Sequence, residues 1–326
     1  MKKLRVIICL LICAVLVVCG TPQQAKAESE SVYLGGFSVG ISLDIGGLLV
    51  ESVSGVETEY GLATVDGLRR GDIIRRIDGT EVKRVSEMQE LLLGKDCVTV
   101  RLLRDGDELD VEVKPITEIY SNKPRLGIKV KEKIYGVGTV TFVRQNGRYA
   151  ALGHEIYDSE TDTHIPICDG KIHACKIIGV KQGKKGEAGA ILASIIADSV
   201  YGTVNCNNNF GISGHYDCDK YKDEIIEIAD RSEVKPGAAQ IRTTIDNKPE
   251  YFDVEIIKAS HQSGRKEKGI VFRVTDKRLL DLTGGVVRGM SGSPIIQNGK
   301  LVGAVTHVFL NDFTKGYGVY ADCLNK

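Results

Sequence analysis

The hydrophobic positions of this chain recur mainly with the two-residue period of β-strands. Short runs rich in Val, Ile and Thr are separated by glycine, Asn-Gly and Asp-Gly turns, and the 326 residues include 37 glycines. Such alternation between turn residues is typical of half-buried strands. One segment differs, because apolar residues at 85, 88, 91 and 92 have helical spacing. The pattern therefore predicts a mainly β protein.

The N-terminus has a different pattern, an unbroken apolar run over residues 6–19. Basic residues precede the run, and Ala25-Lys26-Ala27 follows it. This is the layout of a secretory signal peptide over residues 1–27. The run is short for a membrane-spanning helix. An uncleaved membrane anchor stays open as an alternative, as does a lipid attached at Cys19.

Composition narrows the possible partners. The 43 acidic and 43 basic residues leave no net charge, which argues against nucleic acid recognised by bulk charge. No Cys-x-x-Cys pair occurs, so we expect no metal site, and we expect no cofactor. In an exported chain, both free thiols and one or two disulfides remain possible. The cysteines after the signal segment are Cys97, Cys168, Cys175, Cys206, Cys218 and Cys323.

Residues 33–115 show the strand and helix order of a small α+β domain. A strand ends in the Asp78-Gly79 turn, a helix is expected over 85–93, and a hairpin turns at Asp105-Gly106. The string Gly71-Asp72-Ile73-Ile74, followed by Ile77-Asp78-Gly79, resembles the signature of PDZ domains.

The resemblance to PDZ domains implies that an extended peptide adds as a strand to a sheet edge. The carboxylate-binding loop would map onto the backbone N–H groups of Val39, Gly40 and Ile41. The alternative is that these glycine-rich residues only shape a turn.

A second domain is expected over residues 125–326, after a proline-containing linker at 116–124. Many short strands with glycine turns predict a β-barrel or sandwich. The run 190–198 could be a short helix or a buried strand. Further strands are expected at 175–180, 199–204, 238–244, 251–258 and 269–274, and a last hairpin turns at Asn298-Gly299.

The segment Gly289-Met290-Ser291-Gly292-Ser293-Pro294 carries the candidate chemistry. Glycines on both sides of Ser291 permit a tight turn that exposes its hydroxyl. Such a turn can also direct two backbone N–H groups at one point, as an oxyanion hole requires. A plain hairpin loop has the same composition, so the assignment depends on partners elsewhere.

A nucleophilic serine needs a base and a group that orients the base. His154 ends an apolar strand and is the preferred base, whereas His307 lies within a strand and could be a core residue. The remaining histidines fall in polar segments. For the carboxylate, spacing alone leaves Asp276, Asp281 and Asp312 open, and Asp276 could instead cap a short helix.

Several motifs fall in the same order as in the stage IV sporulation protein B peptidases of endospore-forming bacteria, and the chain resembles that family after its signal segment. The resemblance implies a chymotrypsin-like fold, with His154 as base, Asp276 as orienting carboxylate and Ser291 as nucleophile. It implies an oxyanion hole made by the N–H groups of Gly289 and Ser291. The motifs are Gly153-His154, Val274-Thr275-Asp276, Gly284-Gly285, Gly289–Pro294 and Gly303–Phe309.

The resemblance also implies a role in sporulation. The enzyme would be exported across the forespore inner membrane into the intermembrane space. There it would cleave itself, with residues 28–34 as a candidate region, and a membrane-associated regulatory protein complex. This would relieve inhibition of a membrane metalloprotease that processes a late sigma factor. The chain departs from chymotrypsin-like proteases at Met290 and in the short Asp276–Ser291 spacing. The rival hypothesis is a non-catalytic exported PDZ-containing binding protein.

Overall fold

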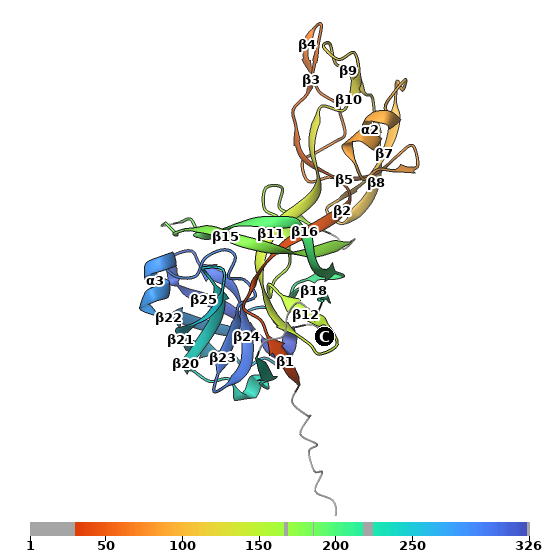
Figure 1. Cartoon of the computed structure of the whole chain (residues 1–326). Helices are drawn as coiled ribbons and strands as arrows, with labels where there is room; N and C mark the ends of the chain where they lie inside the picture. Colours follow the sequence, from red (N-terminus) through yellow and green to blue (C-terminus); the bar gives the residue numbers. More distant parts are fainter. Residues whose placement is uncertain (1–29, 166–168, 185, 218–223, 325–326) are drawn as a thin grey trace, which may run out of the picture. The chain divides into compact units, whose positions relative to one another are not determined.

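The computed structural model describes residues 30–165, 169–184, 186–217 and 224–324. The expected signal segment, Cys168 and Cys218 therefore lie outside the described residues. Apart from Glu30, the described residues belong to one compact unit, which begins at Ser31. The protein is mainly β, as the hydrophobic pattern predicted, with α-helices at only two places in the described chain (Figure 1).

The PDZ domain has its own core beneath one helix. Helix α2 (Val85–Leu91) buries Met88 against strand residues such as Ile74 and Val100. The Asp78 and Asp105 turn residues have positive φ angles, as tight turns of this kind require. The other PDZ strands are β3 (Val56–Thr58), β4 (Gly61–Ala63), β5 (Ile73–Ile77), β6 (Thr80–Glu81), β7 (Val98–Arg104) and β8 (Asp107–Val113).

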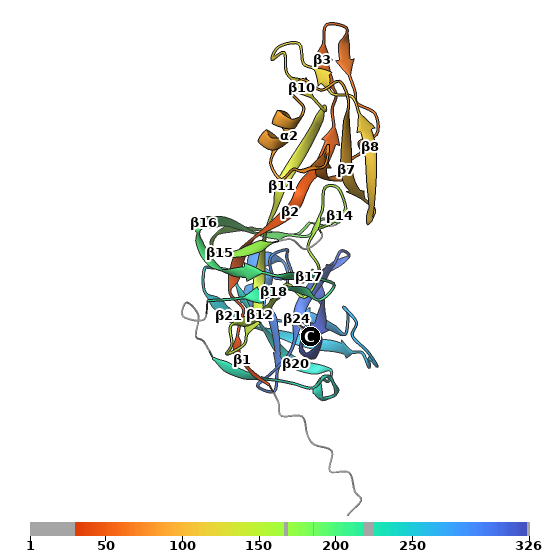
Figure 2. The ribbon, with the colours of Figure 1, turned by 90° about the vertical axis from the view of Figure 1, so that its right-hand side faces the viewer.

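Two long strands belong to both domains. Strands β2 (Ser38–Val53) and β11 (Ile128–Val143) run antiparallel and lie side by side in Figures 1 and 2. Residues Leu48 and Val50 of β2 lie in the PDZ core, whereas Val39 and Ile41 lie in a separate core of the peptidase part. The segment expected to be a linker contains a small ladder of β9 (Ile116–Thr117) and β10 (Pro124–Arg125).

The first core of the peptidase part lies around β11 and β2. Strand β15 (Gly170–Lys181) pairs with β2, and β16 (Ala190–Val204) pairs with β15. The run 190–198, for which helix and strand were both open, is therefore a strand. The remaining strands up to Ile228 are β1 (Ser31–Leu34), β12 (Arg148–Ala151), β13 (Tyr157–Asp158), β14 (Thr163–His164), β17 (Cys206–Asn208), β18 (Gly211–His215) and β19 (Ile225–Ile228). Of these, β1 and β19 contribute Val32, Leu34 and Ile226 to the second core.

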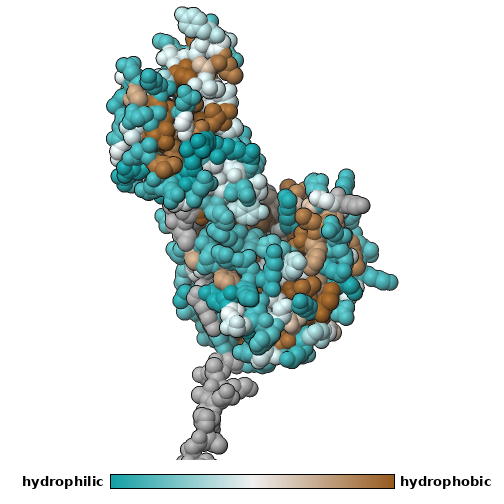
Figure 3. Space-filling model, turned by 180° about the vertical axis from the view of Figure 1, so that it is seen from behind, coloured by the Kyte–Doolittle hydropathy of each residue, from teal (hydrophilic) through white to brown (hydrophobic). Residues whose placement is uncertain are grey.

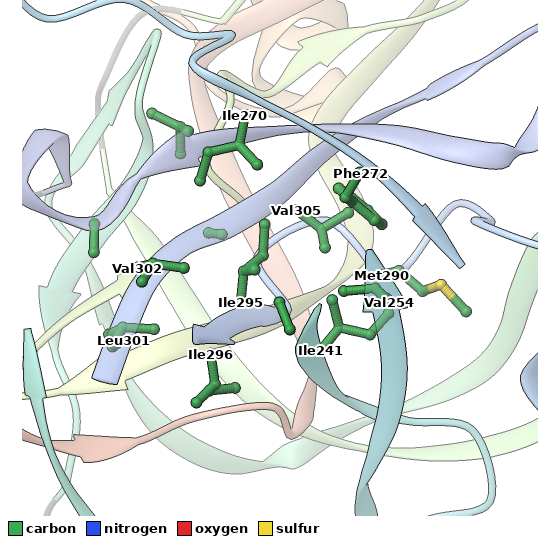
Figure 4. Close-up of a cluster of buried hydrophobic side chains, with 14 of the residues drawn as sticks. Ile241, Val254, Ile270, Phe272, Met290, Ile295, Ile296, Leu301, Val302 and Val305 are labelled. Carbon is green, nitrogen blue, oxygen red and sulfur yellow. The ribbon is translucent and has the colours of Figure 1, made fainter. Parts of the chain in front are cut away.

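The second core is formed by the C-terminal strands. Alternating burial along β21 (Pro249–Ala259) directs every second side chain inward. In Figure 4, Met290 lies among these buried side chains beside Val254. Further elements are η2 (Arg231–Glu233), β20 (Gly237–Thr244), β22 (Ile270–Val274), α3 (Lys277–Thr283), β23 (Pro294–Gln297), β24 (Lys300–Phe309), β25 (Asp312–Tyr320) and η3 (Ala321–Cys323).

Polar residues cover much of the face seen in Figure 3, and apolar residues gather in separate patches. Among the described residues, no helix has the length and apolar character needed to cross a membrane. The four described cysteines are free thiols: Cys97, Cys175, Cys206 and Cys323.

Candidate active site

The nucleophile turn lies in the second core and leads directly into strand β23. Gly289 and Gly292 have φ angles of 98° and 94°, a backbone conformation that favours glycine. A Cβ atom at Gly292 would lie 2.0 Å from the Thr139 carbonyl oxygen, so no larger residue fits. Met290 is fully buried and anchors the turn, while Ser291 is partly exposed. The turn therefore presents the Ser291 side chain while its neighbours are held inside.

Strand β11 holds this turn through three hydrogen bonds. The Thr139 hydroxyl donates to the Gly289 carbonyl at 2.8 Å, and the Thr141 hydroxyl donates to the Gly292 carbonyl at 2.7 Å. The Thr139 N–H donates to the Ser291 carbonyl at 3.0 Å. Both threonines are fully buried. The N–H groups of Gly289 and Ser291, the expected oxyanion hole, have no acceptor within the described chain.

Ser293, the other serine of the turn, has a structural environment. It is fully buried, and its hydroxyl donates to the Thr243 hydroxyl at 2.9 Å. A side chain enclosed in this way has no access to a substrate. The geometry therefore supports Ser291 as the candidate nucleophile.

His154 follows an unusual backbone turn after β12. Leu152 and Gly153 have φ angles of 70° and 71°, and a left-handed conformation at a branched residue such as leucine costs about 1–3 kcal/mol. The turn is tightly packed, because a Cβ atom at Gly153 would lie 2.9 Å from a methyl group of Thr306. Strained backbone held by its surroundings is frequent at functional sites.

The structure brings the nucleophile turn and the His154 turn together. A Cβ atom at Gly292 would lie 2.4 Å from the Leu152 backbone nitrogen. Both Ser291 and His154, however, are hydrogen-bonded to backbone carbonyls. The Ser291 hydroxyl donates to the Thr306 carbonyl at 3.0 Å, and His154 Nδ1 lies 2.9 Å from the Glu155 carbonyl. A proton on Nδ1 leaves the Nε2 lone pair of His154 free to accept the serine proton.

His307 also belongs to this site. Its ring centroid lies 5.1 Å from that of His154, and its Nδ1 is buried without a partner among the described residues. The β24–β25 ladder shifts register between Val305 and His307, and bulges of this kind redirect side chains near active sites. The alternative that His307 is an ordinary core residue is therefore disfavoured. The sequence signal that could have placed His307 in the site was its position in a strand soon after the nucleophile turn.

Burial determines the protonation of both histidines. Burial lowers the pKa of His154, although the hydrogen bond to the Glu155 carbonyl opposes the shift. Burial, with the charges of His154 and Lys268, lowers the pKa of His307 to about 4. The negative charge of Glu267 acts in the opposite direction and offsets part of the lowering of both pKa values. His307 is therefore neutral at pH 7, and His154 is ready to act as a base.

Asp276 is placed away from the two histidines. His307 of β24 and Val271 of β22 both pair with Tyr317, so they lie at the same level of the sheet. Asp276 follows Val271 by five residues, which places it on the order of 10 Å or more along the sheet from that level. Its side chain caps α3 by accepting the Leu279 N–H at 3.0 Å. The structure thus places the Ser291 turn beside the His154 turn, with no hydrogen bond between the two side chains, and does not bring Asp276 to them. The triad role of Asp276 stays a prediction.

A hydrogen-bonded serine–histidine pair is formed by Ser42 and His173, outside the nucleophile turn. The Ser42 hydroxyl lies 2.8 Å from His173 Nε2, and His173 Nδ1 lies 3.0 Å from the Ala197 carbonyl. Ser42 and His173 are 8% and 6% exposed. His173 was expected in a polar segment but lies in β15. Because both side chains are enclosed, this pair has no room for a substrate.

The expected carboxylate-binding loop at Val39, Gly40 and Ile41 is corrected by the structure. These residues lie in the interior of β2, where β11 pairs with one edge and β15 with the other at Gly40 and Ile41. A strand with both edges paired cannot accept a peptide strand. The glycine-rich pattern reflects packing instead, because a Cβ atom at Gly40 would lie 2.7 Å from the Ile195 side chain.

A peptide-sized groove lies elsewhere in the PDZ domain, between α2 and the start of β11. The groove measures about 540 Å³ and is lined by Val85, Met88, Leu126, Ile128 and Val130, among others. Beside the groove, Ile128–Val130 pair with β2 on one edge, and no strand pairs with their other edge in the described structure. The missed sequence signal was Arg125-Leu126-Gly127-Ile128, a glycine turn that enters a strand.

The fold and site define a serine peptidase that carries a PDZ domain. Residues 122–324 match the SpoIVB peptidase S55 family, and residues 46–114 match the PDZ domain family. The first match spans more than half of the chain, so the chain belongs to the SpoIVB peptidase S55 family.

Other similarities are weaker. A putative zinc metalloprotease of Mesorhizobium japonicum is 34% identical over 73 residues, which are 22% of this chain and 19% of that protein. The active form of the Rv3671c protease of M. tuberculosis has 13% identity and a TM-score of 0.32 over 58% of this chain and 70% of that chain. A variant of the HtrA-type protease AlgW with a decapeptide has 10% identity and a TM-score of 0.34, over 62% and 51%.

Replacing Asp276 separates its capping role from a catalytic one. We expect Asp276→Ala to lower the free energy of unfolding by about 1 kcal/mol, whereas Asp276→Ser, which keeps a capping oxygen, should change it little. Urea denaturation measures both. Labelling of Ser291 by a fluorophosphonate then tests catalysis: a native labelling rate in Asp276→Ser would remove Asp276 from the triad.

The labelling rate should fall only at acidic pH. Protonated His154 cannot accept the serine proton, and its lowered pKa moves this loss below pH 6.5. His307 and the charge of Glu267 lie near the base, Lys268 acts on His307, and His307 stays neutral down to about pH 4. Fluorophosphonate labelling between pH 4 and pH 8 measures the midpoint. A midpoint above 6.5 would contradict the buried, neutral base.

Proposed function

We propose that this chain is an exported serine endopeptidase of sporulation that cleaves itself and a membrane-associated regulatory protein. The observation that carries the catalytic part is the convergence of the Ser291 turn with the His154 turn. Beside them, the N–H groups of Gly289 and Ser291 are unoccupied within the described chain.

Catalysis begins when the Ser291 hydroxyl exchanges the Thr306 carbonyl for His154 Nε2. His154 takes the serine proton as Ser291 attacks the peptide carbonyl, and the N–H groups of Gly289 and Ser291 stabilise the oxyanion. His154 then protonates the leaving amine, and water releases the acyl group. In this structure the Glu155 carbonyl lies at Nδ1. Asp276, as the proposed third member, would have to leave its capping position and take the place of this carbonyl.

The sporulation role rests on the family and on the N-terminal segment. The apolar run over residues 6–19 supports export across the forespore inner membrane into the intermembrane space, with transient anchoring there. Cleavage of the regulatory complex would release a membrane metalloprotease and so promote late sigma-factor processing. No cofactor takes part in this proposal.

Self-cleavage is constrained by the position of β1. Val32 and Leu34 are fully buried, and β1 pairs with β11 on one side and β19 on the other. A protease needs its substrate strand extended and accessible, so the Ser31–Leu34 part of the candidate region is protected. We therefore propose cleavage before Ser31. Residues 28 and 29 lie outside the described chain.

The PDZ domain would bind an extended peptide along β11. The free edge of Ile128–Val130 can pair with a peptide backbone, and Val85 and Met88 of α2 offer apolar contacts for alternate side chains. The turn at Arg125–Gly127 replaces residues 39–41 as the candidate carboxylate-binding loop. Gly127 has a φ angle of 60°.

Substituting the two serines of the turn tests the proposed function against the non-catalytic alternative. We expect Ser291→Ala to abolish truncation of the full-length chain upon expression, because the nucleophile is lost. Ser293→Ala should act mainly through stability, since its hydroxyl bonds Thr243. Immunoblotting measures the products. If the purified Ser291→Ala variant still trims itself, Ser291 is not the nucleophile.

Substituting Ile128 tests the groove. Ile128→Lys places a charge on its apolar lining and should weaken binding of a fluorescent peptide with a free, hydrophobic C-terminus about tenfold or more. Leu93→Lys is the control, because Leu93 is 57% exposed next to α2 and does not line the groove. Fluorescence anisotropy, with the amidated peptide in parallel, measures affinity. Equal affinity in both variants would exclude this groove.

A further inference from the structure

The loop that follows His154 is organised by one buried carboxylate. Asp158 is 5% exposed and lies in the hairpin of β13 and β14. It accepts the N–H and the hydroxyl of Thr161 at 2.9 Å and 3.0 Å. These bonds close the hairpin turn, and the hairpin begins three residues after His154. The shape of this loop therefore depends on Asp158 staying ionised and in place.

Lys131 of β11 supplies the counter-charge. Its Nζ lies 2.9 Å from Asp158 Oδ2 and also contacts Glu160 in the same hairpin. Burial raises the pKa of Asp158, but the bonds from Lys131 and Thr161 outweigh burial and lower it. Removing Lys131 would leave a carboxylate buried without its cation, which is strongly unfavourable.

Lys131 also stands at a junction of the fold. It directly follows Ile128–Val130, which border the PDZ groove. The β2–β11 ladder shifts register between Lys129 and Val130 and again between Lys131 and Lys133, so Lys131 lies between two irregularities of the ladder. Its ion pair therefore ties the strand that borders the groove to the loop that carries the candidate base.

A second hold on the loop lies closer to His154. The Asn207 side chain accepts the Ile156 N–H at 2.8 Å and donates to the Ile156 carbonyl at 2.9 Å. The segment between His154 and Asp158 is thus fixed at Ile156 and again at Asp158. Glu155, whose carbonyl orients His154 Nδ1, lies immediately before the first of these points.

We propose that Lys131 is a positioning residue for His154, acting through its ion pair with Asp158. It holds the loop so that the Glu155 carbonyl keeps the imidazole in its productive orientation. This inference rests on the proposed function, in which His154 is the base for Ser291.

The test compares two neighbouring lysines in the full chain. Lys131→Met should lower the maximal rate of fluorophosphonate labelling at Ser291 between about 10-fold and 100-fold, since small misplacement of a catalytic group has effects of this size. The reagent concentration at half-maximal rate should stay unchanged, because the binding surface is intact. Lys131→Arg should recover most of the rate. Lys133→Met is the control, because Lys133 is exposed on the same strand and does not line the PDZ groove.

A double-mutant cycle shows whether the effect passes through the ion pair. Asp158→Asn should lower the rate as Lys131→Met does, and the double variant should be no slower than either single variant. Thermal melting confirms folding. If Lys131→Met does not fold, Asp158→Asn and Lys131→Arg carry the comparison.

The outcomes separate the two hypotheses. Native labelling in Lys131→Met, or fully additive losses in the double variant, would overturn the role of Lys131 alone. Labelling that persists in Ser291→Ala, or no labelling of the native chain, would overturn the proposed function itself.

Discussion

The hydrogen bonds from β11 to the nucleophile turn are the constraint on which the site depends. Thr139 and Thr141 are fully buried hydroxyls that donate to the carbonyls of Gly289 and Gly292. A buried carbonyl without a donor costs about 1–3 kcal/mol, so the turn and the strand specify each other. Strand β11 also contributes to the first core. These bonds therefore connect the Ser291 turn, which belongs to the second core, to the first core, after whose strand β12 the base His154 follows.

Within this frame, backbone carbonyls contact both reactive side chains. The Thr306 carbonyl accepts the Ser291 hydroxyl, and the Glu155 carbonyl lies at His154 Nδ1. A carbonyl can fix the imidazole tautomer, but it carries no full negative charge with which to stabilise the imidazolium. The site therefore has an oriented base and a serine that must change its hydrogen-bond partner before it attacks. Glu267 supplies a negative charge that acts on both histidines.

The errors of sequence reasoning concern residues whose environment comes from distant segments. The pattern at 36–41 has the glycines and alternation of a PDZ loop, yet β11 and β15 enclose it. The groove instead uses Leu126, Gly127 and Ile128, which lie outside the matched PDZ residues 46–114. Local pattern could not distinguish the two, because both are glycine turns that enter strands. Long-range pairing decided which strand kept a free edge.

The sequence by itself determined the β class, the strand and helix spacing, the PDZ signature and the glycine-flanked Ser291, since these depend on local periodicity and on turn chemistry. It also indicated a cap at Asp276, because capping is decided within four residues. Only the tertiary structure decided which histidines meet, that Ser293 is enclosed, and that Lys131 reaches Asp158. Those contacts join residues 27 or more positions apart, and hydrophobic packing of two cores, rather than any local preference, brings them together.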